Sequence, residues 1–473
     1  MVRNIDLAEQ LKNDFLEYSY QVNVDRSFCA IDGLKSCQRL SLYAMYKNKF
    51  THNKPFVKSA KVVGIVIGEY SPHGDTATYD CIVRMTQPFA NNQTPCEMHG
   101  NGGSLSDPSP AAQRYTEVRL SEFGEELFKD IEISVPYIDN FDSSTKQPVL
   151  LPTPVPLLLI NGCDGIGVTL ATRVLPYNFT EVSETYKNYL INGKIDKVLY
   201  PDFPTGGQIV TCEAEQIMST GKGKTVLRAR ASIDKKNRQI IFEELCYQTN
   251  VSTLYSKLIE NVAKGTFSEI KNIQNATGKD GVKLIIEYKR GTEPEALLEK
   301  LYKKTDLQKT YTSNHNMLVK KTPRLLSLEQ YFELLYKFQD SCIKFRCHNE
   351  LKSYQQKIEK SNGLIFANEN IEPIIKLIRS SNGKAEAKEK LMAGFALNEM
   401  QAEAIVSLPL YKINKLDGAE LIKNRNDMME SFNAIQQKMN DKELRKQELI
   451  EKLEALIKKY PSKRKTSVDN LKA

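Results

Sequence analysis

Two long stretches in the last third of this sequence carry apolar residues at helical spacing, and they constrain its fold most strongly. The first starts at Ser327, where Gln330 three residues later predicts a capping box at the beginning of a helix. Its apolar positions then follow at spacings of three and four: Leu335, Phe338, Cys342 and Phe345. The second stretch covers about residues 418–459. At 1.5 Å per residue, such helices reach roughly 45–60 Å, which is more than a small domain can enclose.

Residues 363–417 lie between the two stretches and have the pattern of a compact helical piece. Two long helices joined by a small globule predict an antiparallel coiled-coil arm with a knob at its tip. An ordinary helical bundle explains the heptads equally well, but the intervening globule favours the arm. We therefore expect one domain over residues 326–473.

The rest of the 473-residue chain, whose length suggests about three domains, divides into two regions. In residues 1–150 we expect short helices at 36–46 and 59–70, followed by Asp75 as the N-cap of a helix that ends near residue 87. Two helices joined by a short turn containing glycine form a helix-turn-helix, whose second helix enters a DNA major groove. This signal is weak by itself, because most helix pairs bind nothing.

Residues 151–325 mix strand and helix signals and predict an α/β domain. Strands are expected at 226–231 and 239–242 around a lysine-rich turn, a helix at 251–264 and a buried strand at 283–288. The whole chain is thus expected to be an α+β multidomain protein.

Composition excludes several classes of protein. With 41% hydrophobic and 26% charged residues, the chain is globular rather than disordered. Its longest apolar stretch, residues 149–160, contains three prolines and is too short to span a bilayer, and no apolar signal-peptide core is visible. Nine scattered cysteines without a C-x-x-C pair indicate reduced thiols and a cytoplasmic protein, not a disulfide framework or a zinc finger.

The net charge of +8 is concentrated in three basic segments, residues 26–61, 219–239 and 300–325, each with a single acidic residue. The remainder of the chain is net acidic. Focal positive segments on an acidic body indicate a polyanion-binding surface. The alternative is that the segments are solvated, lysine-rich loops.

Motifs that would indicate a complete catalytic site within this chain are incomplete or absent. Gly223-Lys224-Thr225 resembles the end of a phosphate-binding loop, but the first glycine of that motif is replaced by Met218, so no ATP site is indicated. No Asp-x-Asp pair occurs that could hold magnesium, and no Ser/His/Asp grouping stands out among the five histidines. No metal ligands are therefore assigned in this chain.

Tyr115 is the candidate nucleophile that remains. A tyrosine hydroxyl has a pKa near 10 and needs a neighbouring cation to act at neutral pH, which Arg114 supplies from the adjacent position. From spacing alone this is a weak argument, because most of the 22 tyrosines serve packing.

The segment Arg114-Tyr115-Thr116-Glu117-x-Arg119-Leu120 resembles the catalytic-tyrosine motif of the breakage-reunion subunit of type IIA DNA topoisomerases, the gyrase A/topoisomerase IV A family. The resemblance continues in order along nearly the whole chain, through matching patches at residues 32–35, 58–64, 72–75, 79–89, 161–166, 201–207, 279–290 and 401–405.

The resemblance implies a transesterification. Tyr115 would attack a DNA phosphate and become linked to the 5′ end, leaving a 3′-hydroxyl, and Arg114 would stabilise the pentavalent phosphate. The phosphodiester energy is kept in the phosphotyrosine, so resealing needs no cofactor. The alternative is a non-catalytic, architectural DNA-binding protein. Such a protein would have lost the nucleophile, whereas Arg114 and Tyr115 are both present here.

The resemblance also implies DNA contacts. Arg26, Lys35 and Arg39 match positions that hold backbone phosphates, and His73 matches a histidine near the reacting phosphate. Ile166 matches the isoleucine that wedges between base pairs and bends the duplex. Thr76, also on the DNA-binding side, and Asp80 match positions that contact quinolone drugs.

Three positions depart from the family pattern. Ser71 replaces the first histidine of the turn before the recognition helix, Gln38 replaces another histidine, and Leu40 replaces an arginine. The nucleophile is retained, but the proton and phosphate contacts and the sensitivity to drugs do not follow from the resemblance.

The resemblance assigns roles to the three regions: a winged-helix DNA gate, a tower domain, and a coiled-coil arm that ends in a dimerisation domain. One tyrosine cuts one strand, so a homodimer is expected on double-stranded DNA. ATP and most of the Mg²⁺ coordination are expected from a partner ATPase subunit, with no membrane involved.

The segment after the arm reads Lys463-Arg464-Lys465 and then a short polar tail, without the β-pinwheel domain of gyrase A. We therefore expect ATP-dependent relaxation and decatenation rather than negative supercoiling. This organisation resembles the medium subunit of T-even-type phage topoisomerases, which would act in the cytoplasm of the bacterial host. A truncated bacterial gyrase A or topoisomerase IV subunit is the alternative.

Overall fold

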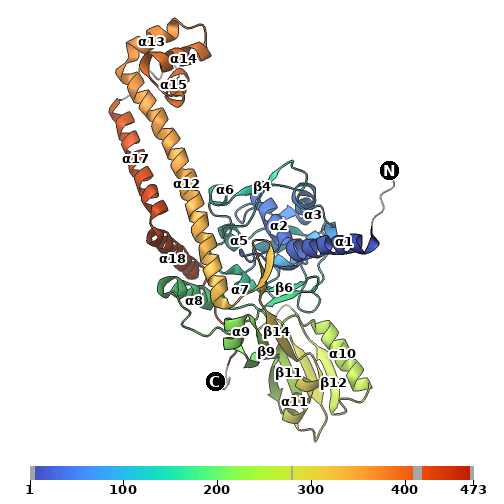
Figure 1. Cartoon of the computed structure of the whole chain (residues 1–473). Coiled ribbons are helices and arrows are strands. Elements are labelled where there is room, and N and C mark those ends of the chain that lie inside the picture. The colour runs from blue at the N-terminus through green and yellow to red at the C-terminus, as the bar shows by residue number, and fades with distance from the viewer. Residues whose placement is uncertain (1–5, 279–280, 409–417, 469–473) are drawn as a thin grey trace. The chain divides into compact units, whose positions relative to one another are not determined.

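The computed structural model describes residues 6–278, 281–408 and 418–468 (Figure 1). The chain forms two compact units, the first made of residues 1–131, 135–339 and 449–473, the second of residues 132–134 and 340–448. Both units combine to give a mixed α/β protein. In the described residues, no helix has the length and apolar character needed to cross a membrane.

The first unit begins with helices that surround the N-terminal part of the core. They are α1 (Leu7–Gln21), the π-helical turn η1 (Val22–Ser27), α2 (Ser36–Lys47), α3 (Ser59–Ile65), the π-helical turn η2 (Val66–Tyr70) and α4 (Asp75–Thr86). The predicted helices are confirmed, but Asp75 is the first residue of α4 and Gly74 is its N-cap. An Asp in the first turn still favours the helix through its charge.

A small antiparallel sheet packs beside these helices. Its strands are β1 (Val57–Lys58), β2 (Cys96–His99) and β3 (Glu117–Leu120), in the order β1-β3-β2. Burial alternates along β3, so that Val118 and Leu120 face the core. The start of β3 fixes the chain immediately after Tyr115.

Two larger sheets follow in the same unit. The five-stranded sheet has the order β6-β7-β14-β9-β8, formed by Cys163–Ile166, Ala171–Val174, Gln308–Asn314, Lys222–Arg228 and Gln208–Cys212. The four-stranded sheet has the order β10-β11-β13-β12, formed by Arg230–Asp234, Gln239–Glu244, Leu284–Tyr288 and Ile270–Asn275. Helices α10 (Val251–Ala263) and α11 (Pro294–Lys304) pack their apolar residues on the four-stranded sheet (Figure 1).

The strand predicted at 226–231 is wrong in one respect, because the structure divides it between the two sheets. β9 ends at Arg228 and β10 starts at Arg230, with the buried Ala229 between them. The Ala229 N–H donates to Leu307 O at 2.8 Å, so its backbone is satisfied outside either ladder. The alternation of apolar residues with Arg228 and Arg230 runs through both halves without a break, so the sequence pattern does not reveal the crossing.

Shorter elements complete the first unit: α5 (Glu122–Glu126), α6 (Ile131–Ser134, which reaches the unit boundary), β4 (Tyr137–Asp139), β5 (Lys146–Pro148), α7 (Leu157–Asn161), α8 (Phe179–Asn192), α9 (Ala214–Thr220), β15 (Asn316–Val319) and β16 (Thr322–Leu325).

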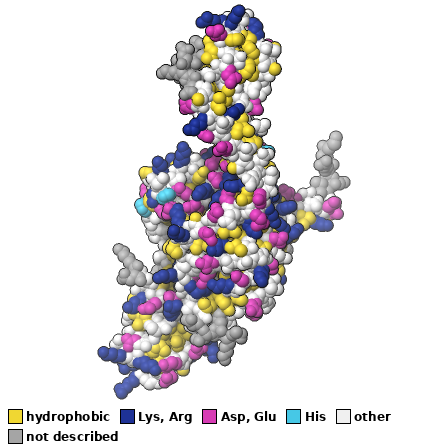
Figure 2. All heavy atoms as spheres, turned by 90° about the vertical axis from the view of Figure 1, so that its left-hand side faces the viewer, with side chains coloured by type: hydrophobic (Ala, Val, Ile, Leu, Met, Phe, Trp, Pro, Cys, Tyr) yellow, Lys and Arg dark blue, Asp and Glu magenta, His cyan; other side chains and the backbone are white. Residues whose placement is uncertain are grey.

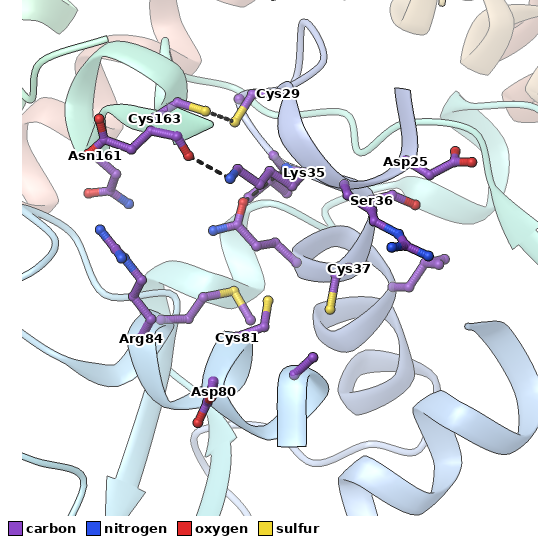
Figure 3. Close-up of a pocket in the computed structure, with 18 of the residues that line it drawn as sticks. Asp25, Cys29, Lys35, Ser36, Cys37, Asp80, Cys81, Arg84, Asn161 and Cys163 are labelled. Carbon is purple, nitrogen blue, oxygen red and sulfur yellow. Dashed lines mark hydrogen bonds between the residues drawn. The ribbon is translucent and has the colours of Figure 1, made fainter. Parts of the chain in front are cut away.

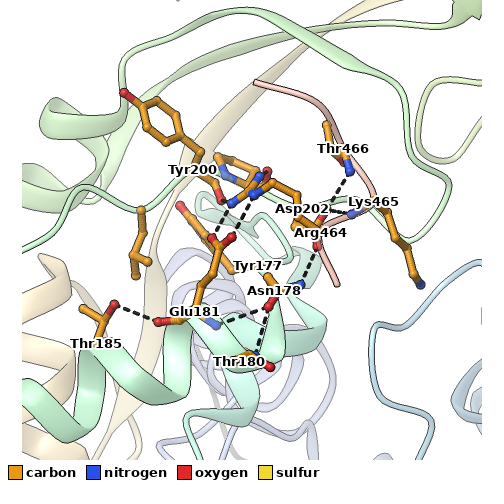
Figure 4. A network of polar contacts seen from close by, with 12 residues as sticks. Tyr177, Asn178, Thr180, Glu181, Thr185, Tyr200, Asp202, Arg464, Lys465 and Thr466 are labelled. Carbon is orange, nitrogen blue, oxygen red and sulfur yellow. Dashed lines mark hydrogen bonds and ion pairs between the residues drawn. The ribbon is translucent and has the colours of Figure 1, made fainter. Parts of the chain in front are cut away.

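The segment after the last helix packs back on the first unit (Figure 4). The Arg464 guanidinium forms two hydrogen bonds with the Glu181 carboxylate, the longer at 2.9 Å. One carboxylate oxygen of Asp202 accepts the N–H groups of Lys465 and Thr466 at 2.9 and 2.8 Å. Residues 464–466 are therefore bonded to the first unit, with Thr466 buried and Lys465 exposed.

Long helices dominate the second unit: α12 (Leu328–Glu369), α13 (Ile371–Arg379), α14 (Lys384–Phe395), α15 (Glu399–Val406), α17 (Gly418–Asn440) and α18 (Lys442–Lys459), of which α12 and α18 cross the unit boundary. The capping box at Ser327 is confirmed by reciprocal bonds with Gln330 at 3.0 and 3.2 Å. α12 continues past the predicted end at residue 363. The compact piece has its own core, which includes Ile374, Leu391 and Ile405; part of the predicted globule, residues 409–417, lies outside the described residues.

The second predicted long helix is interrupted at Asp441. Its carboxylate accepts the N–H groups of Glu443 and Leu444 at 2.8 and 3.3 Å, which makes it the N-cap of α18. The Arg445 side chain donates to the carbonyls of Lys438 and Met439 at the end of α17. Local side-chain bonds therefore split a helix that the heptad pattern predicts as continuous.

Candidate functional site

Tyr115 lies in the turn that precedes β3, and its side chain is 64% exposed. Its N–H donates to Ala112 O at 2.9 Å, and the Arg114 guanidinium carbon lies 4.7 Å from the centre of its ring. Because most of its surface is exposed, Tyr115 is not part of the hydrophobic core. The turn presents a phenolic hydroxyl to solvent with a cation beside it, which is the arrangement that a tyrosine nucleophile needs.

The turn that carries Tyr115 is held from both sides by α4. The Tyr79 hydroxyl donates to Ala111 O at 2.7 Å and lies 2.7 Å from Thr116 Oγ1, which in turn lies 2.9 Å from Ser59 Oγ. Sequence reasoning missed this contact, because a separation of more than thirty positions leaves no spacing signal.

A second tie reaches the same turn from the start of α4. Gln113 Nε2 donates to the Asp75 carboxylate at 2.9 Å. The turn that carries Tyr115 and α4, the helix expected to meet DNA, therefore form one local framework.

A cleft of about 850 Å³ opens between α2, α4 and the chain around β6 (Figure 3). It collects four of the predicted site residues, Arg26, Lys35, His73 and Asp80. Arg84 from α4 also lines it and was not predicted. Five polar side chains from three chain segments thus converge on one hollow.

A second hollow of about 840 Å³ lies along the β6–β7 hairpin and contains Ile166. Arg26 and Lys35 line it too, together with Arg84 and Arg173. Arg173 pairs with Asp164 at 2.7 Å, while Lys35 Nζ donates to Asp164 O at 2.6 Å. The cations of the two hollows are therefore shared, and they face the same region of the first unit.

Ile166 is 88% exposed at the end of β6. Asn23 fixes the tip of this hairpin, because its side chain bonds both the N–H and the carbonyl of Val168. Ser27 Oγ donates to Ile166 O at 2.8 Å. A large apolar side chain held out on a braced hairpin can enter a partner surface without a change of backbone conformation.

Arg39 is placed differently from the other predicted phosphate ligands. It is 7% exposed, and its guanidinium bonds both carboxylate oxygens of Asp32 at 2.6 and 2.8 Å as well as Leu34 O. Asp32 also accepts the Leu151 N–H at 3.1 Å. The Arg39–Asp32 ion pair therefore links α2 to the backbone at Leu34 and Leu151. Arg39 lines neither hollow.

His73, Thr76 and Asp80 are exposed around the start of α4, but Thr76 lines neither hollow, nor do Tyr115 and Arg114. The structure thus brings Arg26, Lys35, His73, Asp80 and Ile166 to the two hollows, whereas Tyr115, the predicted nucleophile, lies outside both.

The three departures from the family pattern have structural roles. Gln38 Oε1 accepts the Lys35 N–H at 2.9 Å and closes the first turn of α2. Leu40 and Ser71 are both buried. A glutamine at a helix cap, a leucine in the core and a buried serine thus stand where the family pattern has two histidines and an arginine.

Acidic partners reduce the positive charge of the basic segments. Within residues 219–239, ion pairs join Arg228 with Glu299, and Lys235 with Glu295. On the face drawn in Figure 2, Lys and Arg side chains are interspersed with Asp and Glu side chains rather than gathered in one block. Among the residues that the structure describes, no three His, Cys, Asp or Glu side chains gather as metal ligands.

The chain is similar in sequence to known proteins over nearly its whole length. Residues 26–454 match the family model of the A subunit of DNA gyrase/topoisomerase IV. The chain is 35% identical to the DNA gyrase A subunit of Synechocystis over 480 residues, which cover 98% of this chain and 56% of the relative. It is 36% identical to the DNA topoisomerase 4 A subunit of Staphylococcus epidermidis over 444 residues, covering 91% and 55% of the two chains.

This chain belongs to the DNA gyrase A/topoisomerase IV A family. It spans about half the length of the curated relatives that it matches.

Proposed function

We propose that this chain is the DNA cleavage and religation subunit of a type II DNA topoisomerase. The observation that carries the proposal is the exposed Tyr115 with the Arg114 guanidinium over its ring, in a chain of this family. The Tyr115 phenolic oxygen attacks a backbone phosphorus, the bond to the 3′ oxygen breaks, and a 5′-phosphotyrosine and a free 3′-hydroxyl result. The reverse attack by that hydroxyl reseals the strand.

The other residues of the site supply binding and orientation. Arg114 stabilises the charge on the five-coordinate phosphate, and Arg26 and Lys35 hold phosphates along the shared hollows. His73 lies near the reacting phosphate. Ile166 enters the base stack and bends the duplex, which a braced, exposed side chain favours.

The larger assembly is also part of the proposal. The helices α2, α3 and α4 with the sheet β1-β3-β2 form a winged-helix DNA gate, the two larger sheets form a tower, and the helices of the second unit form a coiled-coil dimerisation arm. Since Tyr115 cuts one strand, two copies of this chain act on each duplex. We assign Mg²⁺ and ATP to a partner protein.

The proposal is tested by trapping the covalent intermediate. The full chain, with the ATPase partner, Mg²⁺ and supercoiled plasmid, is denatured quickly and the DNA is examined for attached protein. We expect adducts whose 5′ ends resist a 5′ exonuclease while their 3′ ends are extended by a polymerase. Tyr115→Phe should abolish them.

Tyr18→Phe is the matched control, because Tyr18 is also an exposed tyrosine, on α1. It should leave adduct formation unchanged. Protein that binds duplex DNA but forms no adduct in either the native or the Tyr115→Phe form would instead support an architectural DNA-binding role.

A further inference from the structure

Two cysteine thiols meet at the wall of the 850 Å³ cleft, and neither takes part in the proposed cleavage chemistry. The Cys29 thiol donates to Cys163 Sγ across 2.7 Å. Cys29 follows η1 and Cys163 begins β6, so the contact joins segments 134 positions apart (Figure 3). Both side chains line the cleft, and Cys163, which is 9% exposed against 2% for Cys29, is the one that a small solute in the cleft reaches.

The surroundings make the two thiols chemically unequal. The pKa of Cys163 is lowered because the Cys29 thiol donates a hydrogen bond to it, and the nearby Lys35 ammonium also favours its thiolate. The same hydrogen bond, together with burial, raises the pKa of Cys29. Such a pair has one sulfur suited to attack an electrophile and one suited to resolve the product.

The backbone around the pair keeps the two sulfurs together. Ser27, two residues before Cys29, bonds Ile166 O, and the carbonyl of Ser27 lies so close to Gly165 that a Cβ there would clash with it at 1.9 Å. The hydrogen bond from Ser27 and this close approach hold η1 directly against β6. A bond between the sulfurs therefore requires little movement of either segment.

We propose that Cys29 and Cys163 are an oxidative modification site that forms a reversible intramolecular disulfide with a hydroperoxide as the oxidant. The Cys163 thiolate attacks the peroxide oxygen, giving a sulfenic acid and releasing, for hydrogen peroxide, hydroxide that takes up the proton lost from the thiol. The Cys29 sulfur then attacks the sulfenic sulfur, the S–O bond breaks, and a second water leaves. Two thiols and one hydrogen peroxide thus give one disulfide and two waters. A dithiol reductant reverses the change.

The disulfide has a structural consequence for the cleft. It joins the segment that carries Arg26 covalently to the strand that ends at Ile166 and closes a long loop of the chain. Closing a loop of this length stabilises a folded unit by restricting its unfolded state. The proposal stands independently of the cleavage activity, because it concerns thiol chemistry alone.

The test uses the full chain, titrated with hydrogen peroxide under native conditions, alkylated, digested without reduction and mapped by mass spectrometry. We expect a loss of about 2 Da in the first modified species and one linked pair of peptides containing Cys29 and Cys163. The midpoint of thermal unfolding should rise by about 5 °C and return to its original value after dithiothreitol.

Cys29→Ser should leave Cys163 as sulfenic or sulfinic acid, with no linked peptides and no rise in the midpoint. Cys246→Ser is the matched control, because Cys246 is a buried thiol bonded to backbone carbonyls and does not line the cleft; its linkage pattern should equal that of the native chain. Preferential linkage of Cys37 to Cys81, which line the same cleft, overturns the proposal. So does a chain whose nine thiols all stay alkylatable, or a disulfide that lowers the midpoint.

Discussion

Lowering the pH should selectively destabilise the first unit through His315. This residue joins β14 to β15, is 3% exposed, and its Nε2 atom has no hydrogen-bond partner among the described residues. Burial lowers the pKa of His315 to about 4 from the usual 6.5. Because the folded pKa lies below the unfolded one, the unfolded chain takes up a proton first as the pH falls. The stabilisation is complete above about pH 6.5 and is lost progressively down to about pH 4.

The magnitude follows from the displacement of this pKa. At 1.36 kcal/mol for each tenfold change in proton affinity, neutral His315 contributes about 3 kcal/mol over the full range. About 2 kcal/mol of this is lost between pH 7 and pH 4.5, when the two-state titration is integrated over that interval. Carboxylates also titrate there, so the effect must be measured as a difference between variants.

The assay is urea unfolding at pH 7 and pH 4.5, followed by circular dichroism and tyrosine fluorescence, since the chain has 22 tyrosines and no tryptophan. His315→Gln should lose about 2 kcal/mol less stability between the two pH values than the native chain. His348→Gln, at an exposed position on α12, should behave like the native chain. A His315→Gln variant with the full acid sensitivity of the native chain would refute the reasoning.

Three further perturbations have defined outcomes. Tyr79→Phe removes the hydroxyl that bonds Ala111 O and Thr116 but keeps the ring. It should reduce the rate of adduct formation about ten- to hundredfold at unchanged DNA affinity. Tyr302→Phe removes another buried hydroxyl and should leave this rate unchanged. Ile166→Ala should leave the free energy of unfolding within about 0.5 kcal/mol, because the side chain is exposed, but should reduce DNA bending measured by energy transfer between duplex ends. Asp32→Ala leaves a buried guanidinium unpaired and should cost about 3–5 kcal/mol in urea unfolding, whereas a loss below about 1 kcal/mol would contradict the structural role of this pair.

Arg39 and Arg26 show that the charge pattern of the sequence does not predict which basic side chains are buried. Both arginines lie in the same basic segment and match positions that hold phosphates in the family. The structure buries Arg39 against Asp32, seven residues away, and exposes Arg26 on the wall of two hollows. Charge along the chain does not distinguish them, because burial depends on which other segments cover each residue.

The amino-acid sequence by itself determined the features that depend on neighbours along the chain. Apolar residues at helical spacing predicted α12 and the helical character of residues 418–459, a Ser and a Gln three residues apart predicted the start of α12, and the motif around Tyr115 predicted the family. These signals are local, because helix periodicity, capping and a short motif need only a few consecutive residues.

Tertiary structure alone decided the features that depend on distant segments. It divided one predicted strand between two sheets at Ala229, tied the Tyr115 turn to Tyr79 of α4, and brought Cys29 against Cys163. Each of these rests on contacts between residues that are dozens of positions apart. Such contacts form only where the tertiary fold brings distant segments together, so no short stretch of the sequence can specify them.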